Sequence, residues 1–195
     1  MPFSFNGNTP ATITYNGNDV KTVTYNGVTV WEKAAASTAT VYATDTRGWN
    51  SSTYPTALQS NRTMYFGACN STSKRAAILQ FSGLGAYKNP SKVVLHVYRK
   101  NSGSYACRFF PRDDYTNWSI NTVISYSTST DAFEIPGVSG GGWVDVDITT
   151  LWPTILEALN ADDGTVWICI KNNYNTMTFD GDVSGENCPY LVIDN

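Results

Sequence analysis

Residues 143–149 read WVDVDIT, a stretch in which apolar and polar side chains alternate. Successive side chains of a β-strand point to opposite faces of a sheet, so this alternation predicts a strand with one buried face and one solvent-facing face. The set predicted to be buried is Val144, Val146 and Ile148, and the opposite set is Trp143, Asp145 and Asp147. The two aspartates are thus explained as the solvent side of a strand.

The same alternation occurs in VVLHVYRK, residues 93–100. Val93, Leu95 and Val97 are predicted to point inward, and Val94, His96 and Tyr98 outward. Further strand-like stretches begin at Val41, Thr63, Arg75, Tyr105, Thr165 and Tyr190. One segment has a helical period instead, with Leu151, Ile155 and Leu159 at i, i+4 and i+8. Many short strands, one short helix ending near Asn160 and Gly-rich turns predict an all-β chain with a jelly-roll-like β-sandwich.

The N-terminal region has a repeat of its own. An aromatic residue followed by Asn-Gly occurs at residues 5–7, 15–17 and 25–27. Asn-Gly favours two-residue hairpin turns, because both central residues need positive φ. We expect a small β-meander over residues 1–33, a linker over 34–39 and the sandwich over 40–195. Segments below about 40 residues seldom fold alone, so the meander is expected to complete its core against a neighbour.

Composition excludes several classes of function. Charged residues make up 15% of the chain against a usual value of roughly 25%, and the net charge is −3. No basic stripe is present to neutralise phosphates, so nucleic acid is not expected as a partner. No apolar run reaches the roughly 20 residues that span a membrane, and the N-terminus lacks the pattern of a secretory signal. Membrane insertion is therefore not expected.

The four cysteines, Cys69, Cys107, Cys169 and Cys188, include no C-x-x-C pair and have no zinc spacing. Free thiols are favoured. If a disulfide forms, the first pair to test is Cys169 with Cys188, because both are expected on C-terminal strands.

Candidate groups for catalysis or metal binding are few. The single histidine, His96, lies in a strand and is interpreted as structural or surface-exposed, and no G-x-S-x-G motif is present. Paired carboxylates for glycoside hydrolysis are disfavoured, since the obvious pair belongs to an alternating strand. The loop from Asp180 to Glu186 has oxygen ligands of the kind that calcium prefers, but an ordinary acidic turn explains it better. We therefore predict no enzyme activity, no catalytic residue, no metal site and no cofactor.

Aromatic side chains in polar loops are the remaining candidates for ligand binding. The candidates are Trp49, Tyr54, Tyr87 and Tyr174. Sugar or receptor contact is one interpretation of them, and packing beneath a loop or at a subunit interface is the other. The tryptophans in patterned segments are predicted to be core residues: Trp118, Trp143, Trp152 and Trp167.

Two resemblances extend these inferences. The segment NRTMYFG at residues 61–67 resembles the DNRLRxG signature of the DNRLRE-type carbohydrate-binding module family, with Ser60 at the position of the leading Asp. Further segments follow in the order that the family has them: RAAILQFSGL, KVVLHVYRK, Trp118 in DYTNWS, GWVDVDIT and ENCPYLVIDN. This resemblance covers about residues 40–195 and implies a β-sandwich of the kind found on polysaccharide-binding or cell-surface proteins.

The N-terminal segment TITYNGNDVKTVTYNGVTVWEK is similar to short segments of structural proteins from tailed phages of Gram-positive bacteria. It implies a virion protein, assembled in the host cytoplasm, that docks on other virion proteins through residues 1–33. We expect a fibre, spike or decoration subunit, with a trimer favoured, whose sandwich binds host or environmental glycans. The alternatives are a carbohydrate-binding module of a bacterial wall or polysaccharide-active protein, and a capsid or tail component without ligand.

Overall fold

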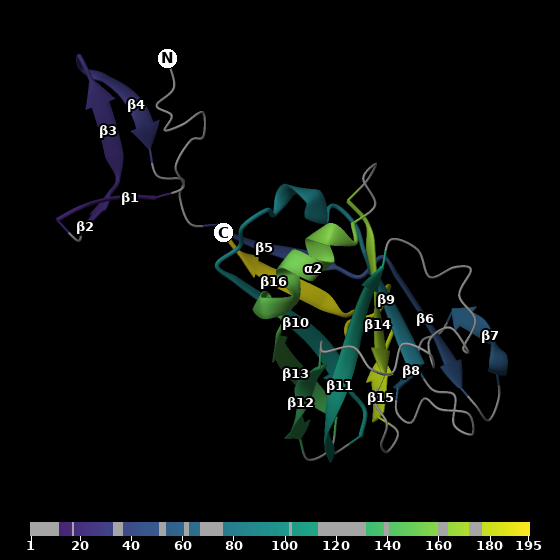
Figure 1. The fold of residues 1–195 in the computed structure, drawn as a ribbon. Helices are drawn as coiled ribbons and strands as arrows, with labels where there is room; N and C mark the ends of the chain where they lie inside the picture. The colour runs from purple at the N-terminus through teal and green to yellow at the C-terminus, as the bar shows by residue number, and fades with distance from the viewer. Residues whose placement is uncertain are drawn as a thin grey trace. The chain divides into compact units, whose positions relative to one another are not determined.

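The computed structural model describes residues 12–16, 18–32, 37–50, 54–60, 63–66, 76–101, 103–112, 132–138, 141–159, 164–171 and 177–195 (Figure 1). Side chains are not described at residues 49–50, 54–60, 63–66, 103–112, 132–138, 171 and 177. The chain divides into two compact units, Met1–Ser37 and Thr38–Asn195. The prediction of an all-β chain is confirmed, with small hairpins in the first unit and a sandwich of antiparallel sheets with one short helix in the second.

The first unit contains two separate two-stranded antiparallel sheets. The first pairs β1 (Ile13–Tyr15) with β2 (Asn18–Val20), and the second pairs β3 (Thr22–Tyr25) with β4 (Val28–Glu32). At the turn between β3 and β4, Asn26 has φ +50° and Gly27 has φ +76°. These positive values are what a type I′ turn requires, so the Asn-Gly pair there forms the predicted hairpin.

The second unit is built from two sheets, and all their described pairings are antiparallel. The first sheet contains β5 (Thr38–Tyr42), β16 (Tyr190–Asp194), β10 (Lys92–Arg99), β15 (Met177–Asp180), β8 (Thr63–Phe66) and β13 (Gly142–Asp147). The second sheet contains β12 (Ala132–Val138), β11 (Gly103–Arg112), β14 (Val166–Lys171), β9 (Ala76–Phe81), β6 (Asp45–Asn50) and β7 (Tyr54–Ser60). Strand β5 begins at Thr38, within the stretch 34–39 predicted as the linker.

The hydrophobic core lies between the two sheets and follows the predicted alternation. The inward sets of β10 and β13 are buried, including Leu95 and Val146, while their opposite sets are partly or fully exposed. Strands β9 and β14 differ, because side chains from both of their faces are buried, for example Ile78 and Cys169. The second sheet is therefore covered on both sides around these two strands. On the outward face of the first sheet, the side chains of β10 and β16 are mostly half-buried and those of β13 are exposed.

A short helical segment closes one end of the sandwich (Figure 1). It consists of a 3-10 turn, η2 (Thr149–Leu151), continued by α2 (Trp152–Glu157). Trp152 and Ile155 are buried in the core, next to Leu84 of the 3-10 turn η1 (Leu84–Ala86). The predicted helix is present, and Pro153 lies in its first turn, where a missing backbone N–H costs nothing.

Candidate functional site

The outward face of the first sheet carries a continuous group of ring side chains. This aromatic cluster consists of Tyr42, His96, Tyr98, Trp143 and Tyr190. Cross-strand register explains it, since Tyr190 lies opposite Tyr42 on one side and opposite His96 on the other. Tyr98 lies opposite Trp143 in the neighbouring pair. Four strands from distant parts of the chain thus place five rings on one surface.

The rings contact one another closely. The His96 and Tyr190 rings are stacked, with centroids 4.5 Å apart and planes inclined by 8°. Trp143 meets Tyr190 and Tyr98 edge-on, with centroid distances of 5.3 and 5.6 Å, and Tyr42 is tilted against Tyr190 at 5.5 Å. Aromatic pairs in such geometries are each worth about 0.5–1.5 kcal/mol beyond their buried area. The cluster is therefore held in place before any ligand arrives.

Two members of the cluster are open to solvent. Tyr42 is 59% exposed and Trp143 is 40% exposed, although large aromatic side chains are usually covered. A protein surface that holds several rings in a rigid exposed group commonly serves for binding. The prediction that Trp143 is a core residue is wrong, because β13 presents Trp143 on the outward side together with Asp145.

A hollow of about 320 Å³ lies beside the aromatic cluster on the same sheet face. Its lining residues are Lys92, Val94, His96, Asp145, Asp147, Val192 and Asp194. Val94 and Val192 are cross-strand neighbours and form an apolar centre. The polar side chains surround this centre, so the hollow combines an apolar floor with a charged margin.

Each carboxylate of the hollow is oriented by a neighbouring donor. His96 Nδ1 lies 2.7 Å from Asp145 Oδ1, and Thr38 Oγ1 donates to Asp194 Oδ1 at 2.7 Å. Asp147 Oδ1 accepts two hydrogen bonds from Thr149, from Oγ1 at 2.6 Å and from the backbone N–H at 2.9 Å. These bonds from Thr149, led by the hydroxyl, lower the pKa of Asp147, which therefore stays ionised at neutral pH.

The pKa of the Tyr190 hydroxyl is shifted in the opposite direction, upward. Burial, followed by the negative charge of Asp145, raises the pKa of Tyr190. The phenol therefore keeps its proton at neutral pH and can donate a hydrogen bond to a ligand oxygen.

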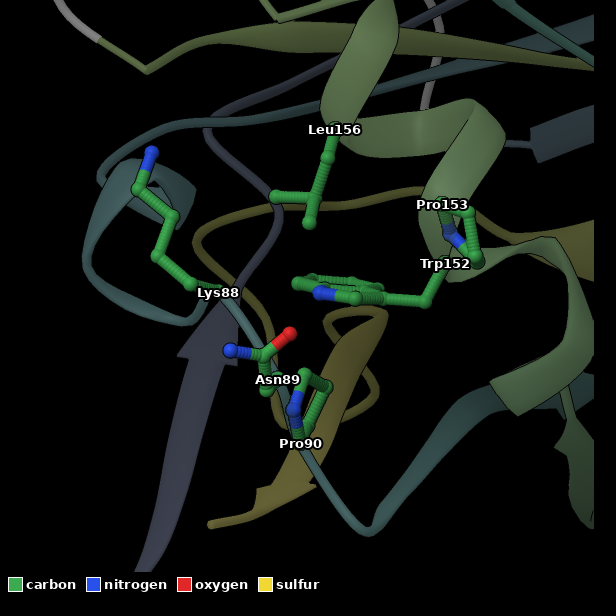
Figure 2. A pocket seen from close by; sticks show the side chains of 6 residues that line it. All are labelled: Lys88, Asn89, Pro90, Trp152, Pro153 and Leu156. Carbon is green, nitrogen blue, oxygen red and sulfur yellow. The ribbon is translucent and has the colours of Figure 1, made fainter. Parts of the chain in front are cut away.

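A second hollow, of about 430 Å³, lies beside helix α2 and is shown in Figure 2. The Trp152 ring lies between the Leu156 side chain on one side and Asn89 and Pro90 on the other. Trp152 is only 3% exposed, and its Nε1–H donates to the Tyr87 carbonyl at 2.8 Å. Both its faces and its donor are already used, so this indole stabilises the end of the sandwich and offers no stacking surface.

The structure does not unite the four aromatic residues predicted as ligand contacts. Trp49 and Tyr54 lie in paired strands, β6 and β7, so their placement in a long polar loop is wrong. Trp49 pairs with Ala76 of β9, which gives its backbone the hydrogen bonds of a sheet. Tyr87 is half-buried and packs against the core, while Tyr174 lies outside the described residues. The ligand roles of Trp49, Tyr54, Tyr87 and Tyr174 stay predictions.

The predictions for the core tryptophans and the cysteines are confirmed at some positions and fall outside the described residues at others. Trp152 and Trp167 are buried, as predicted, and Trp118 lies outside the described residues. Cys169 and Cys188 are both buried and neither is in a disulfide, so the bridge named as the first to test is not formed, and the preference for reduced thiols is confirmed at these two positions. Burial, as the largest cause, raises the pKa of the Cys188 thiol. Cys69 and the Cys107 side chain are outside the described part.

In the acidic loop considered for calcium binding, the carboxylates of Asp180 and Asp182 are already engaged by donor groups of the protein. Asp182 Oδ1 accepts hydrogen bonds from Ser184, and Asp180 Oδ2 lies 3.3 Å from Asn187 Nδ2 and 3.5 Å from Lys100 Nζ. Among the described residues, no group of three or more His, Cys, Asp or Glu side chains is arranged to hold a metal ion. Nor is any helix in that part of the chain long and apolar enough to cross a membrane.

Comparisons with known proteins give no relative from which a ligand could be inferred. No protein-family model matches the chain, and the search of curated proteins finds no similar sequence.

Proposed function

We propose that this chain is a non-enzymatic display protein whose sandwich binds glycans on the outward face of the first sheet. The observation that carries the proposal is the rigid, exposed aromatic cluster next to a polar hollow. Sugar rings have apolar C–H faces that stack on aromatic rings, and their hydroxyl groups need hydrogen-bond partners at the margin. Tyr42 and Trp143 offer the rings, and the side chains of the hollow offer the donors and acceptors.

A catalytic role is a weaker explanation of the same residues. The Asp145–His96 pair lies on an open sheet face, where water has free access to the carboxylate, which is 66% exposed. Enzymes usually enclose their acid and base groups, since exclusion of water strengthens electrostatic stabilisation. The pair is better suited to hold the His96 ring against Tyr190 than to transfer protons.

We further propose that the first unit docks the protein onto a phage particle. The similarity of this unit to tailed-phage structural segments suggests the docking role. Exposed apolar side chains on both hairpins support it, since Tyr15, Tyr25 and Val28 are each at least 65% exposed. Two-stranded hairpins are marginal in isolation, and these side chains would be covered by a virion partner or by sister subunits. A homo-oligomer, with a trimer favoured, fits this arrangement.

The second candidate function is a structural component without ligand. The exposure of Tyr42 and Trp143 favours it as well, because the same rings could form an interface between copies of the chain. A carbohydrate-binding module of a bacterial wall or polysaccharide-active protein would use the sheet face as we propose and differ only in what the first unit attaches to.

The test is binding of the full chain to an array of host cell-wall and environmental polysaccharides, followed by calorimetry on the best ligand. The variants Tyr42→Ala and Trp143→Ala should each weaken binding by about 1–3 kcal/mol, the range measured for aromatic stacking platforms. Tyr25→Ala removes an equally exposed ring from the other unit and should leave binding unchanged. Unaltered binding in both sheet variants would remove the proposed site. An oligomer that dissociates in Trp143→Ala would favour the structural candidate.

A further inference from the structure

The hollow beside the aromatic cluster has an excess of negative charge that indicates the class of sugar. We propose that it takes sugars with a free, protonated amino group in preference to neutral sugars, N-acetylated ones included, or acidic sugars. This inference rests on the glycan-binding function proposed above.

The charge balance of the hollow is the first observation. Asp145, Asp147 and Asp194 face a single lysine, Lys92, and the one histidine is engaged with Asp145. A uronic acid entering this space would meet more carboxylates than cations. A protonated amine would find opposite charge on two sides, because Asp147 belongs to β13 and Asp194 to β16.

The availability of the carboxylate oxygens is the second observation. All three aspartates use Oδ1 for their bonds to protein, to His96, Thr149 and Thr38. Within the described part of the chain, the Oδ2 atoms of these aspartates accept no hydrogen bond. Each carboxylate is thus fixed in orientation through one oxygen while the second can accept from an ammonium group. Hydrogen bonds between ionised partners are stronger than those between neutral groups.

The spacing of the groups suits a polymer better than a single ion. The three carboxylates form no group able to hold a metal ion among the described residues. Trp143, Asp145 and Asp147 lie at alternate positions of β13, so consecutive members are about 7 Å apart along the strand. A chain of amino sugars running along this edge could stack one ring on Trp143 and place amino groups of following units near the two aspartates.

Among the described strands, β13 forms backbone pairs only with β10, and β12 of the second sheet lies close to it. A polysaccharide can lie along the exposed outward face of β13 without displacing a paired strand of the sheet. The apolar floor of Val94 and Val192 accommodates the C–H face of a sugar ring.

The experiment compares three soluble ligands of similar length with the full chain by calorimetry. The ligands are an oligomer of β-linked glucosamine, its fully N-acetylated counterpart and an oligomer of a uronic acid. Acetylation removes the charge of an amine, so the first two ligands differ mainly in charge. The glucosamine oligomer should bind about tenfold more tightly than the acetylated one at low salt, and this preference should shrink as salt screens the charges.

Two changes in the protein test the role of the hollow directly. The double variant Asp147→Asn, Asp194→Asn should weaken binding of the glucosamine oligomer about tenfold and affect the acetylated oligomer far less, because asparagine keeps an acceptor oxygen and removes only the charge. Lys92→Gln should strengthen binding of the glucosamine oligomer about two- to threefold, a gain that misfolding cannot produce. Glu157→Gln, which removes an exposed charge on helix α2 outside the hollow, is the matched control.

The outcomes separate this inference from the function on which it rests. Equal or tighter binding of the acetylated or uronic oligomer, with no effect of the aspartate variants, would overturn the amino-sugar preference and leave glycan binding standing. If none of the three ligands and no polysaccharide on the array binds, both proposals are wrong.

Discussion

Replacement of Trp152 by alanine tests how the helical end of the sandwich contributes to stability. The indole is 3% exposed, belongs to the main core and donates a hydrogen bond to the Tyr87 carbonyl at 2.8 Å. Truncation of a buried tryptophan to alanine costs about 3–5 kcal/mol, because transfer energy is lost and a cavity remains. The hydrogen bond accounts for about 1 kcal/mol of that loss. Since whole domains are stable by only about 5–15 kcal/mol, a large part of the total should disappear.

The assay is urea unfolding of the full chain, followed by far-ultraviolet circular dichroism, with thermal melting in parallel. Each 1 kcal/mol lowers the melting temperature of a domain of this size by about 2–4 °C, so Trp152→Ala should lower it by roughly 6–20 °C. Trp152→Phe keeps most of the apolar burial and should lose only about 1–2 kcal/mol.

Trp143→Ala provides the contrast on the surface. Trp143 is 40% exposed and has two edge-on ring contacts, each worth about 0.5–1.5 kcal/mol, so its loss should cost about 1–3 kcal/mol. In glycan binding per folded molecule the order should reverse, with Trp143→Ala impaired and Trp152→Ala intact. A cost below about 1 kcal/mol for Trp152→Ala would show that the helical end does not unfold with the sandwich, which would refute this account of the core.

Two further changes test local features of the sandwich. Thr149→Ala removes the hydroxyl that lowers the pKa of Asp147 and should cost about 1–2 kcal/mol at pH 7. Because the pKa of Asp147 is lower in the folded state than in the unfolded state, its ionised carboxylate stabilises the fold at pH values above the unfolded pKa. This contribution disappears as the pH falls through the folded pKa. Urea unfolding at about pH 3 should therefore show a smaller difference between Thr149→Ala and wild type. Gly164→Ala should cost about 2–4 kcal/mol in thermal melts, because φ is +65° and a Cβ there would lie 2.8 Å from the Gly85 nitrogen. Gly83→Ala, with positive φ but open space, should cost about 1 kcal/mol, and equal losses at both glycines would contradict the steric argument.

Local alternation in the sequence was enough to predict which side chains of a strand share a face. Val93, Leu95 and Val97 are buried and His96 lies opposite them, as the pattern of residues 93–98 required. This succeeds because the period of two is a property of the extended backbone itself and needs no knowledge of neighbouring strands. The Asn-Gly turn between β3 and β4 was predictable for the same reason, since positive φ is a local demand.

Strand neighbours, by contrast, were decided only by the tertiary structure. The sequence around Trp49 predicts a loop, because Gly48 and the neighbouring polar residues lack the apolar alternation of a strand, although β6 covers this stretch. In the sheet, Gly48 is required, since a Cβ there would lie 2.9 Å from the Ala76 carbonyl oxygen of the paired strand β9. That demand comes from a segment distant in sequence, and a local pattern cannot show it.

The candidate site depended on the same non-local pairing. The sequence placed His96 on the outward face of its strand, and it placed Trp143 on the side opposite the buried valines. It could not show that Tyr42 and Tyr190, which are 148 positions apart, would lie next to them. The alternation within a strand determines which of its side chains point outward. Which outward side chains become neighbours depends on the register and order of β5, β16, β10 and β13, and these are fixed by the packing of the whole core.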